Sequence, residues 1–165
     1  MKGAVASALV LGLMMSGAAL GSPRDEAQIR ALLDRWRLAY THKDLPGVMS
    51  IYATGPDLVA YDITPPLQYR GFAAYRKDYQ DYFDQFSGAL EVEERDVHVS
   101  ADGDIGYAFG LERVGGVLKS GGKSETWTRF TTIFRKIGGR WYAVHDHISV
   151  PTDFATGKSA LDLRP

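Results

Sequence analysis

Two runs of alternating apolar and polar residues meet at Gly138-Gly139, and this pattern constrains the fold more than any other feature of the chain. Together the runs cover residues 128–151. A Gly-Gly pair supplies the two positive-φ positions of a type I′ turn, so a two-residue loop would pair Ile137 with Arg140. The sequence therefore predicts a β-hairpin and an antiparallel sheet that contains it.

The register of this hairpin, counted without interruption from the turn, assigns each side chain to one face. It places Thr132 opposite His145 and Phe130 opposite His147. One face of the hairpin is therefore predicted to be aromatic and to carry both histidines.

Arg129 and Asp146 fall on the other face in this register. We expect them to form an ion pair, which would lower the pKa of Asp146 and make it a poor base. A shift of one residue would exchange the two faces, so both residues are kept as candidate ligand-binding groups.

His145 and His147 are the sharpest candidates for catalysis, because residues two apart in a strand share a face. Three interpretations stay open. Imidazoles with pKa values near ~6.5 would accept and donate protons close to neutrality. As metal ligands they would need a third ligand, which the sequence does not identify, so no metal site is predicted. In the third interpretation, hydrogen bonds satisfy both rings inside a polar-lined core or a subunit contact.

Helical periodicity precedes the strands. Apolar residues at helical spacing predict helices near residues 22–42, 44–52 and 72–86, with a short strand at 58–61. Runs of helices followed by runs of strands predict an α+β domain. Its three N-terminal helices would pack on one face of a curved antiparallel sheet.

The period changes to two from Leu90, which predicts four long strands. The phase of the apolar residues reverses along the first of them, so we expect a bulge near residues 94–96. Small residues alternate with large ones between Gly106 and Gly110, and they indicate a face that another element approaches closely.

Four further residues are candidates for a site. Asp62 ends the predicted short strand just before two prolines, where it would act as a catalytic base at a pocket mouth or hydrogen-bond the turn backbone. Tyr61 and Tyr107 would donate hydroxyls to a ligand, although a core tyrosine with a solvated tip fits equally. Arg70 would hold an anionic ligand at the pocket rim or pair with a surface acid.

The first 21 residues contain Lys2 and then small and apolar side chains, the pattern of a secretory signal peptide. A retained membrane anchor is the alternative interpretation. We expect an exported protein, periplasmic or secreted, with one domain at residues 22–155 and a C-terminal tail at residues 156–165. No membrane association is expected after signal cleavage.

Charge and cysteine content exclude several classes of function. Without Lys2 the chain carries 18 basic and 20 acidic side chains, a formal charge of −2. This balance argues against nucleic acid or an anionic membrane as the main partner. The absence of Cys excludes disulfides, thiolate metal sites and Cys nucleophiles. No phosphate-binding or dinucleotide-binding motif is present, so no cofactor is predicted.

Several segments together resemble the SnoaL-like group of the NTF2-like superfamily, over roughly Asp25 to Pro151. The resemblance implies a cone-shaped α+β barrel that encloses a pocket, and a homodimer formed through the outer face of the sheet. It rests on Tyr61-Asp62, Tyr69-Arg70-Gly71 with the aromatic helix after it, Arg129-x-Thr131, Phe134, Gly138-Gly139-Arg140-Trp141 and the ending Val144 to Pro151.

The resemblance implies less about function, since this superfamily includes isomerases, cyclases, dehydratases and non-enzymatic modules. The favoured hypothesis is a domain that binds a small organic molecule. The alternative is an isomerase, cyclase or dehydratase with His145, His147 or Asp62 as the base next to a carbonyl. The chain is also similar to the association domain of calcium/calmodulin-dependent protein kinase II, which adds an oligomerisation module as a third hypothesis. At the position that the register assigns to a pocket arginine of that domain, this chain has Thr132.

Overall fold

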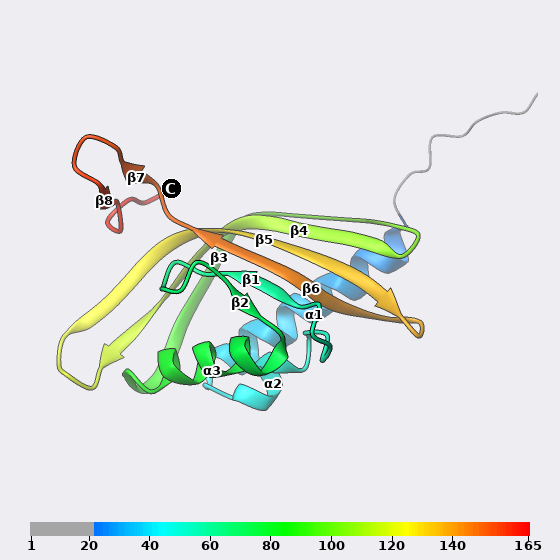
Figure 1. The fold of residues 1–165 in the computed structure, drawn as a ribbon, viewed down its shortest axis with the longest axis horizontal. Coiled ribbons are helices and arrows are strands. Elements are labelled where there is room, and N and C mark those ends of the chain that lie inside the picture. Colours follow the sequence, from blue (N-terminus) through cyan, green and yellow to red (C-terminus); the bar gives the residue numbers. More distant parts are fainter. Residues whose placement is uncertain (1–21) are drawn as a thin grey trace, which may run out of the picture.

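The computed structural model describes residues 22–165, and the predicted signal peptide at residues 1–21 lies outside them. Figure 1 shows the helices on one side of a sheet that bends around them. The elements, in chain order, are α1 (Pro23–Thr41), α2 (Leu45–Met49), β1 (Val59–Tyr61), β2 (Tyr69–Arg70), α3 (Phe72–Phe83), β3 (Phe86–Asp102), β4 (Ile105–Leu118), β5 (Lys123–Ile137), β6 (Arg140–Ser149), β7 (Thr152–Asp153) and β8 (Lys158–Ser159).

The α+β class is confirmed, but two details of the predicted architecture were wrong. The main sheet has the order β2-β1-β6-β5-β4-β3, and β1 runs parallel to β6, so the sheet is mixed and open rather than antiparallel and closed. The short strand predicted at residues 58–61 corresponds to β1, and with β2 it separates α2 from α3, so the helices do not form one uninterrupted N-terminal block. A strand that enters the sheet from the helical layer is free to pair in parallel, since no short hairpin fixes its direction.

Helix α1 begins and packs as its sequence predicts. The Ser22 side chain caps it by accepting a hydrogen bond from the backbone N–H of Asp25 at 3.4 Å, and Pro23 fits the first turn. Its apolar stripe is buried against the sheet. At Gly106 a Cβ atom would lie 2.4 Å from Cδ1 of Ile29, which confirms the close approach expected at the small residues of β4.

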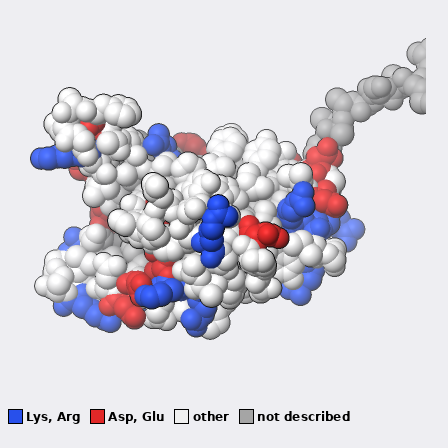
Figure 2. Space-filling model, viewed as in Figure 1, with Lys and Arg blue, Asp and Glu red and all other residues white. Residues whose placement is uncertain are grey.

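The interior is formed by apolar and aromatic side chains between the helices and the concave face of the sheet. On the face shown in Figure 2, basic and acidic side chains are interspersed, in keeping with a formal charge of −1 for the whole chain. Within residues 22–165, no helix is both long and apolar enough to span a membrane.

The hairpin of β5 and β6 follows the predicted register only near its turn. Gly138 and Gly139 have φ angles of 56° and 78°, and Ile137 pairs with Arg140 as predicted. Further along, the register shifts by one residue at a bulge that leaves Val144 without a partner in β5. The bulge predicted in β3 is confirmed, since its pairing with β4 shifts between Arg95 and His98.

Candidate functional site

The bulge in β6 reverses the faces predicted for the end of this strand. Thr132 pairs with Asp146 rather than His145, and Asp146 points into the domain with only 4% of its surface exposed. His145 and His147 point to the outer face, where their rings lie 4.9 and 5.6 Å from the ring of Tyr61. The predicted aromatic face with both histidines was therefore wrong, because a shift of one residue moves every later side chain to the opposite face.

A cavity of about 250 Å³ lies between α1, α3 and the inner face of the sheet. Aromatic rings and carboxyl groups dominate its wall, and none of its lining residues is Lys, Arg or His. The aromatic members are Trp36, Tyr40, Tyr52, Tyr69, Tyr75, Tyr79, Tyr82 and Phe130, and the acidic members are Asp62, Asp78, Asp81, Glu94, Glu112 and Asp146.

Asp146 is held by three hydroxyl donors. Tyr52 and Tyr75 donate to its Oδ2 atom at 2.6 and 3.1 Å, and Thr132 donates to Oδ1 at 2.6 Å. Burial raises the pKa of Asp146, while these hydrogen bonds act in the opposite direction. The carboxyl group is thus fixed at the base of the cavity, and both of its oxygens already accept hydrogen bonds.

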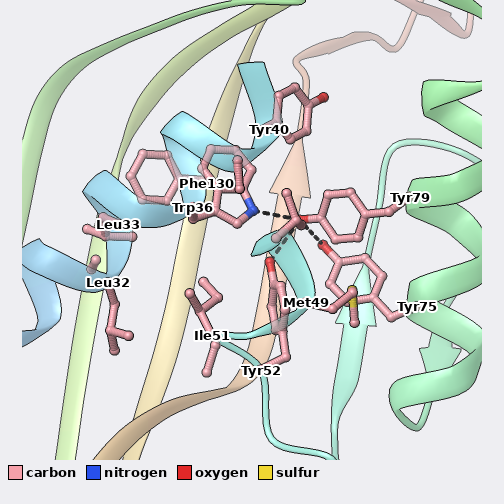
Figure 3. Close-up of a cluster of buried hydrophobic side chains, with 14 of the residues drawn as sticks. Leu32, Leu33, Trp36, Tyr40, Met49, Ile51, Tyr52, Tyr75, Tyr79 and Phe130 are labelled. Carbon is pink, nitrogen blue, oxygen red and sulfur yellow. Dashed lines mark hydrogen bonds between the residues drawn. The ribbon is translucent and has the colours of Figure 1, made fainter. Parts of the chain in front are cut away.

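The tyrosines that bind this carboxyl group are linked to α1 by further hydrogen bonds, and Figure 3 shows the side chains of Trp36, Tyr79 and Tyr52 that form them. The indole Nε1 of Trp36 donates to the Tyr79 hydroxyl at 3.1 Å, and the hydroxyls of Tyr79 and Tyr52 lie 2.8 Å apart. Because Tyr52 uses its proton to bind Asp146, Tyr79 must donate to Tyr52. Burial raises the pKa of Tyr79 well above its ordinary value, so this hydroxyl stays a neutral donor.

Glu112 is the second fully enclosed acid and lies on β4. Its Oε1 atom accepts a hydrogen bond from Thr128 at 3.2 Å, and no group among residues 22–165 donates to Oε2. Burial, followed by the negative charges of Asp146 and Glu94, raises the pKa of Glu112 to about 8. At neutral pH this carboxyl group is therefore largely protonated, with one oxygen available to whatever enters the cavity.

Two further acids lie near the segment that follows β1. Asp62 accepts hydrogen bonds from the backbone N–H groups of Ile63 and Thr64, so the predicted turn role of this residue is confirmed. The hydroxyl of Thr64 lies 3.3 Å from Oδ1 of Asp78. Burial raises the pKa values of both carboxyls, that of Asp78 to about 6, where the charge of Asp62 adds to the effect.

The sequence of residues 29–153 matches the family model of the SnoaL-like domain. The chain belongs to the SnoaL-like family. The predicted family resemblance is thereby confirmed, and no functionally curated protein matches the chain.

Solved structures place the SnoaL-like domain in the wider NTF2-like superfamily. This chain is 34% identical to an NTF2-like protein of unknown function from Pseudomonas putida, and the two structures have a TM-score of 0.79 over 88% of this chain and 99% of that one. A Xanthomonas campestris protein named for the calcium/calmodulin-dependent protein kinase II association domain is 23% identical, with a TM-score of 0.64 over 80% and 91%. A ketosteroid isomerase-like protein from Erwinia carotovora is 21% identical, with a TM-score of 0.62 over 78% and 97%. The last two similarities show the fold alone.

Only two of the predicted site residues, Asp62 and Asp146, line the cavity of the SnoaL-like domain. The remaining six lie away from it. His145, His147, Tyr61, Tyr107 and Arg129 belong to the outer face of the sheet, and Arg70 is exposed on β2. The expected ion pair between Arg129 and Asp146 is absent from the described residues, because the two side chains point to opposite faces.

Sequence reasoning missed several residues of the SnoaL-like domain that line the cavity. Glu112 continues the period-two series of Gly106, Ala108 and Gly110, so the alternation of β4 already placed it on the inner face. Tyr75 and Tyr79 follow the helical period of residues 72–86, which predicts a buried face but does not show that the polar tip of each ring reaches a cavity. Among residues 22–165, no three His, Asp or Glu side chains are arranged to hold a metal ion.

Proposed function

We propose that this SnoaL-like domain binds a small organic molecule in the cavity between α1, α3 and the sheet. The observation that carries the proposal is the cavity itself, whose volume of about 250 Å³ lies just below the ~300–1,000 Å³ typical of ligand pockets. Its wall combines aromatic surface with a few fixed polar groups, the composition that suits an organic ligand.

The polar groups differ in what they offer to a ligand. Asp146 accepts hydrogen bonds from Tyr52, Tyr75 and Thr132 on both of its oxygens, so it serves to fix the tyrosine rings. The Oε2 atom of Glu112 is free to bind a ligand group. A molecule in the cavity therefore meets an aromatic wall and one directional polar contact.

A matched pair of substitutions on β4 tests ligand binding. Val114 lines the cavity, whereas Val117 lies on the same strand, is 52% exposed and does not line it. A library of small organic molecules is screened by ligand-observed NMR against the wild type, Val114→Phe and Val117→Phe. We expect hits whose binding is lost in Val114→Phe and kept in Val117→Phe. A library without hits, or hits that bind both variants equally, would refute the proposal.

Proton transfer is the second candidate function, and the raised pKa values of Glu112 and Asp78 favour it, because groups that titrate near neutrality suit acid–base catalysis. Of the bases proposed from the sequence, only Asp62 lines the cavity. Deuterium exchange into a bound carbonyl compound, followed by NMR, would detect this chemistry, and its absence for every bound compound would exclude it.

Homodimer formation and export stay predictions. The outer face of the sheet exposes Ile105, Tyr107 and Phe109, which is the surface that the expected dimer would cover. Sedimentation equilibrium tests homodimer formation, and fractionation of cells that express the full chain tests export.

A further inference from the structure

The carboxyl groups of the cavity are unequally neutralised. Asp81 and Glu94 form ion pairs with Lys77 and Arg37, the second at 3.6 Å between Nε and Oε2. Asp62, Asp78, Glu112 and Asp146 form no ion pair among residues 22–165. The cavity therefore holds an excess of acidic groups with no basic side chain in its wall.

Glu112 is the carboxyl group of the cavity that is best placed to contact a ligand. It is 6% exposed, lines the cavity and has an Oε2 atom without a protein donor among the described residues. No buried side-chain polar atom among residues 22–165 lacks a hydrogen-bond partner, so Oε2 is accessible from the cavity, where a ligand that donates a hydrogen bond can reach it.

The rings beside Glu112 suit a cation. Tyr40 of α1 and Tyr82 of α3 line the same cavity, and their ring centroids lie 6.0 Å apart. The faces of aromatic rings attract ammonium groups, and this attraction is strongest where water is excluded. An anionic ligand would instead find no basic side chain in the cavity wall to neutralise its charge.

We propose that the ligand of the cavity is a small organic amine whose ammonium group forms an ion pair with Glu112. This inference rests on the proposed function and adds the chemical class of the ligand. The ammonium donates to Oε2 of Glu112, its charge faces the rings of Tyr40 and Tyr82, and the organic part lies against the aromatic wall.

Amine binding must then be coupled to the loss of a proton from Glu112. Since the pKa of this carboxyl is about 8, the cation has to displace the proton at neutral pH. Amine affinity therefore rises with pH up to about pH 8, by at most about tenfold per pH unit. A neutral ligand that accepts a hydrogen bond from protonated Glu112 shows the opposite trend. Several neighbouring groups interact electrostatically with Glu112 or hydrogen-bond to it. They are Asp146 on β6, Glu94 on β3, Asp62 after β1, Thr128 on β5, Tyr40 and Tyr82.

Benzylamine, benzyl alcohol and benzoate are suitable probes, because they share the same aromatic ring and are cationic, neutral and anionic, respectively. Calorimetric titration of the wild-type protein from about pH 6 to about pH 8.5 keeps an ordinary amine protonated, since amine pKa values lie near ~10. We expect benzylamine to bind more tightly than benzyl alcohol, with an affinity that rises with pH and with release of up to one proton per ligand. Benzoate should not bind.

Glu112→Gln keeps the shape of the side chain and an acceptor for Thr128 while removing the charge. In this variant we expect benzylamine affinity to fall at least about tenfold at pH 8 and its dependence on pH to disappear, with benzyl alcohol binding unchanged. Glu93→Gln, on the exposed part of β3, is the control and should behave as the wild type. Unchanged benzyl alcohol binding shows that Glu112→Gln is folded. The pH dependence of benzylamine binding to the wild type is a separate test that does not depend on any variant.

The two proposals fail differently. If library compounds bind and Val114→Phe blocks them, but benzylamine does not bind or binds more weakly as the pH rises, the amine inference is wrong and the ligand-binding function stands. If no compound binds the wild type, both proposals are wrong.

Discussion

At the scale of single residues, two buried carboxyl groups behave in opposite ways. Asp146 accepts hydrogen bonds on both oxygens, whereas Glu112 leaves one oxygen open towards the cavity. Asp146 therefore contributes to the stability of the fold, and Glu112 contributes to what the cavity can bind.

Removal of the Asp146 carboxyl should strongly destabilise the fold. Asp146→Ala leaves the hydroxyls of Tyr52, Tyr75 and Thr132 without their acceptor, and each buried donor without a partner costs about 1–3 kcal/mol. We expect a loss of about 3 kcal/mol or more in the free energy of unfolding, measured with urea. Thr132→Val, which keeps the carboxyl and removes one donor, should cost clearly less. Equal losses would contradict separate contributions from the three hydrogen bonds.

The ionisation of Glu112 should lower stability as the pH rises. Its folded-state pKa of about 8 lies above its ordinary value of 4.5, so the folded domain holds this proton more tightly than the unfolded chain. The contribution is complete below about pH 4.5 and is lost as the pH rises through about 8. Burial raises the pKa values of Asp62 and Asp146 in the same direction.

Glu112→Gln isolates this effect. We expect the variant to lose less stability than the wild type between about pH 5 and about pH 8, by up to about 4 kcal/mol. Urea unfolding at several pH values measures the difference. Parallel profiles for the two proteins would contradict the buried titration of Glu112.

At the scale of elements, the sequence predicts what turns and periodicity control. The Gly138-Gly139 turn fixed the nearest pairs of the hairpin, and the helical stripe of α1 identified its buried side. No sequence pattern predicts the bulge at Val144, because polar and apolar residues of β6 alternate in the same way with or without the bulge. The choice between Asp146 and the histidines depends on donors such as Tyr52, which lies 94 residues from Asp146 in the chain.

The contact of α1 with the sheet depends on the missing side chain of Gly106. Gly106→Ala places a methyl group against Ile29, and overpacking of this kind costs about 1–3 kcal/mol. In an Ile29→Ala background the same substitution should cost much less, which a double-mutant cycle of unfolding free energies measures. Gly55→Ala is the control, since no atom lies closer than 4.0 Å to its added Cβ. The contact model is wrong if Gly106→Ala and Gly55→Ala have the same effect.

At the scale of the whole molecule, the fold follows from the sequence and the site does not. The order of helices and strands and the family resemblance predicted an α+β domain of the NTF2-like type. The cavity is assembled from α1, α3, the segment after β1 and the inner faces of β3 to β6. No local sequence motif shows that these elements meet at one cavity. The sequence alone therefore could not predict that Glu112, Asp78 and Asp62 line the same site.

Methyl-resolved NMR of the isotope-labelled protein with a confirmed ligand tests ligand binding in the cavity most directly. Ile51, Val114 and Ile148 line the cavity, while Ile105, Ile137 and Val117 are exposed elsewhere on the sheet. We expect the largest chemical-shift changes and the ligand contacts at Ile51, Val114 and Ile148. Contacts confined to Ile105, Ile137 and Val117 would contradict ligand binding in the cavity and would locate the binding surface elsewhere on the sheet.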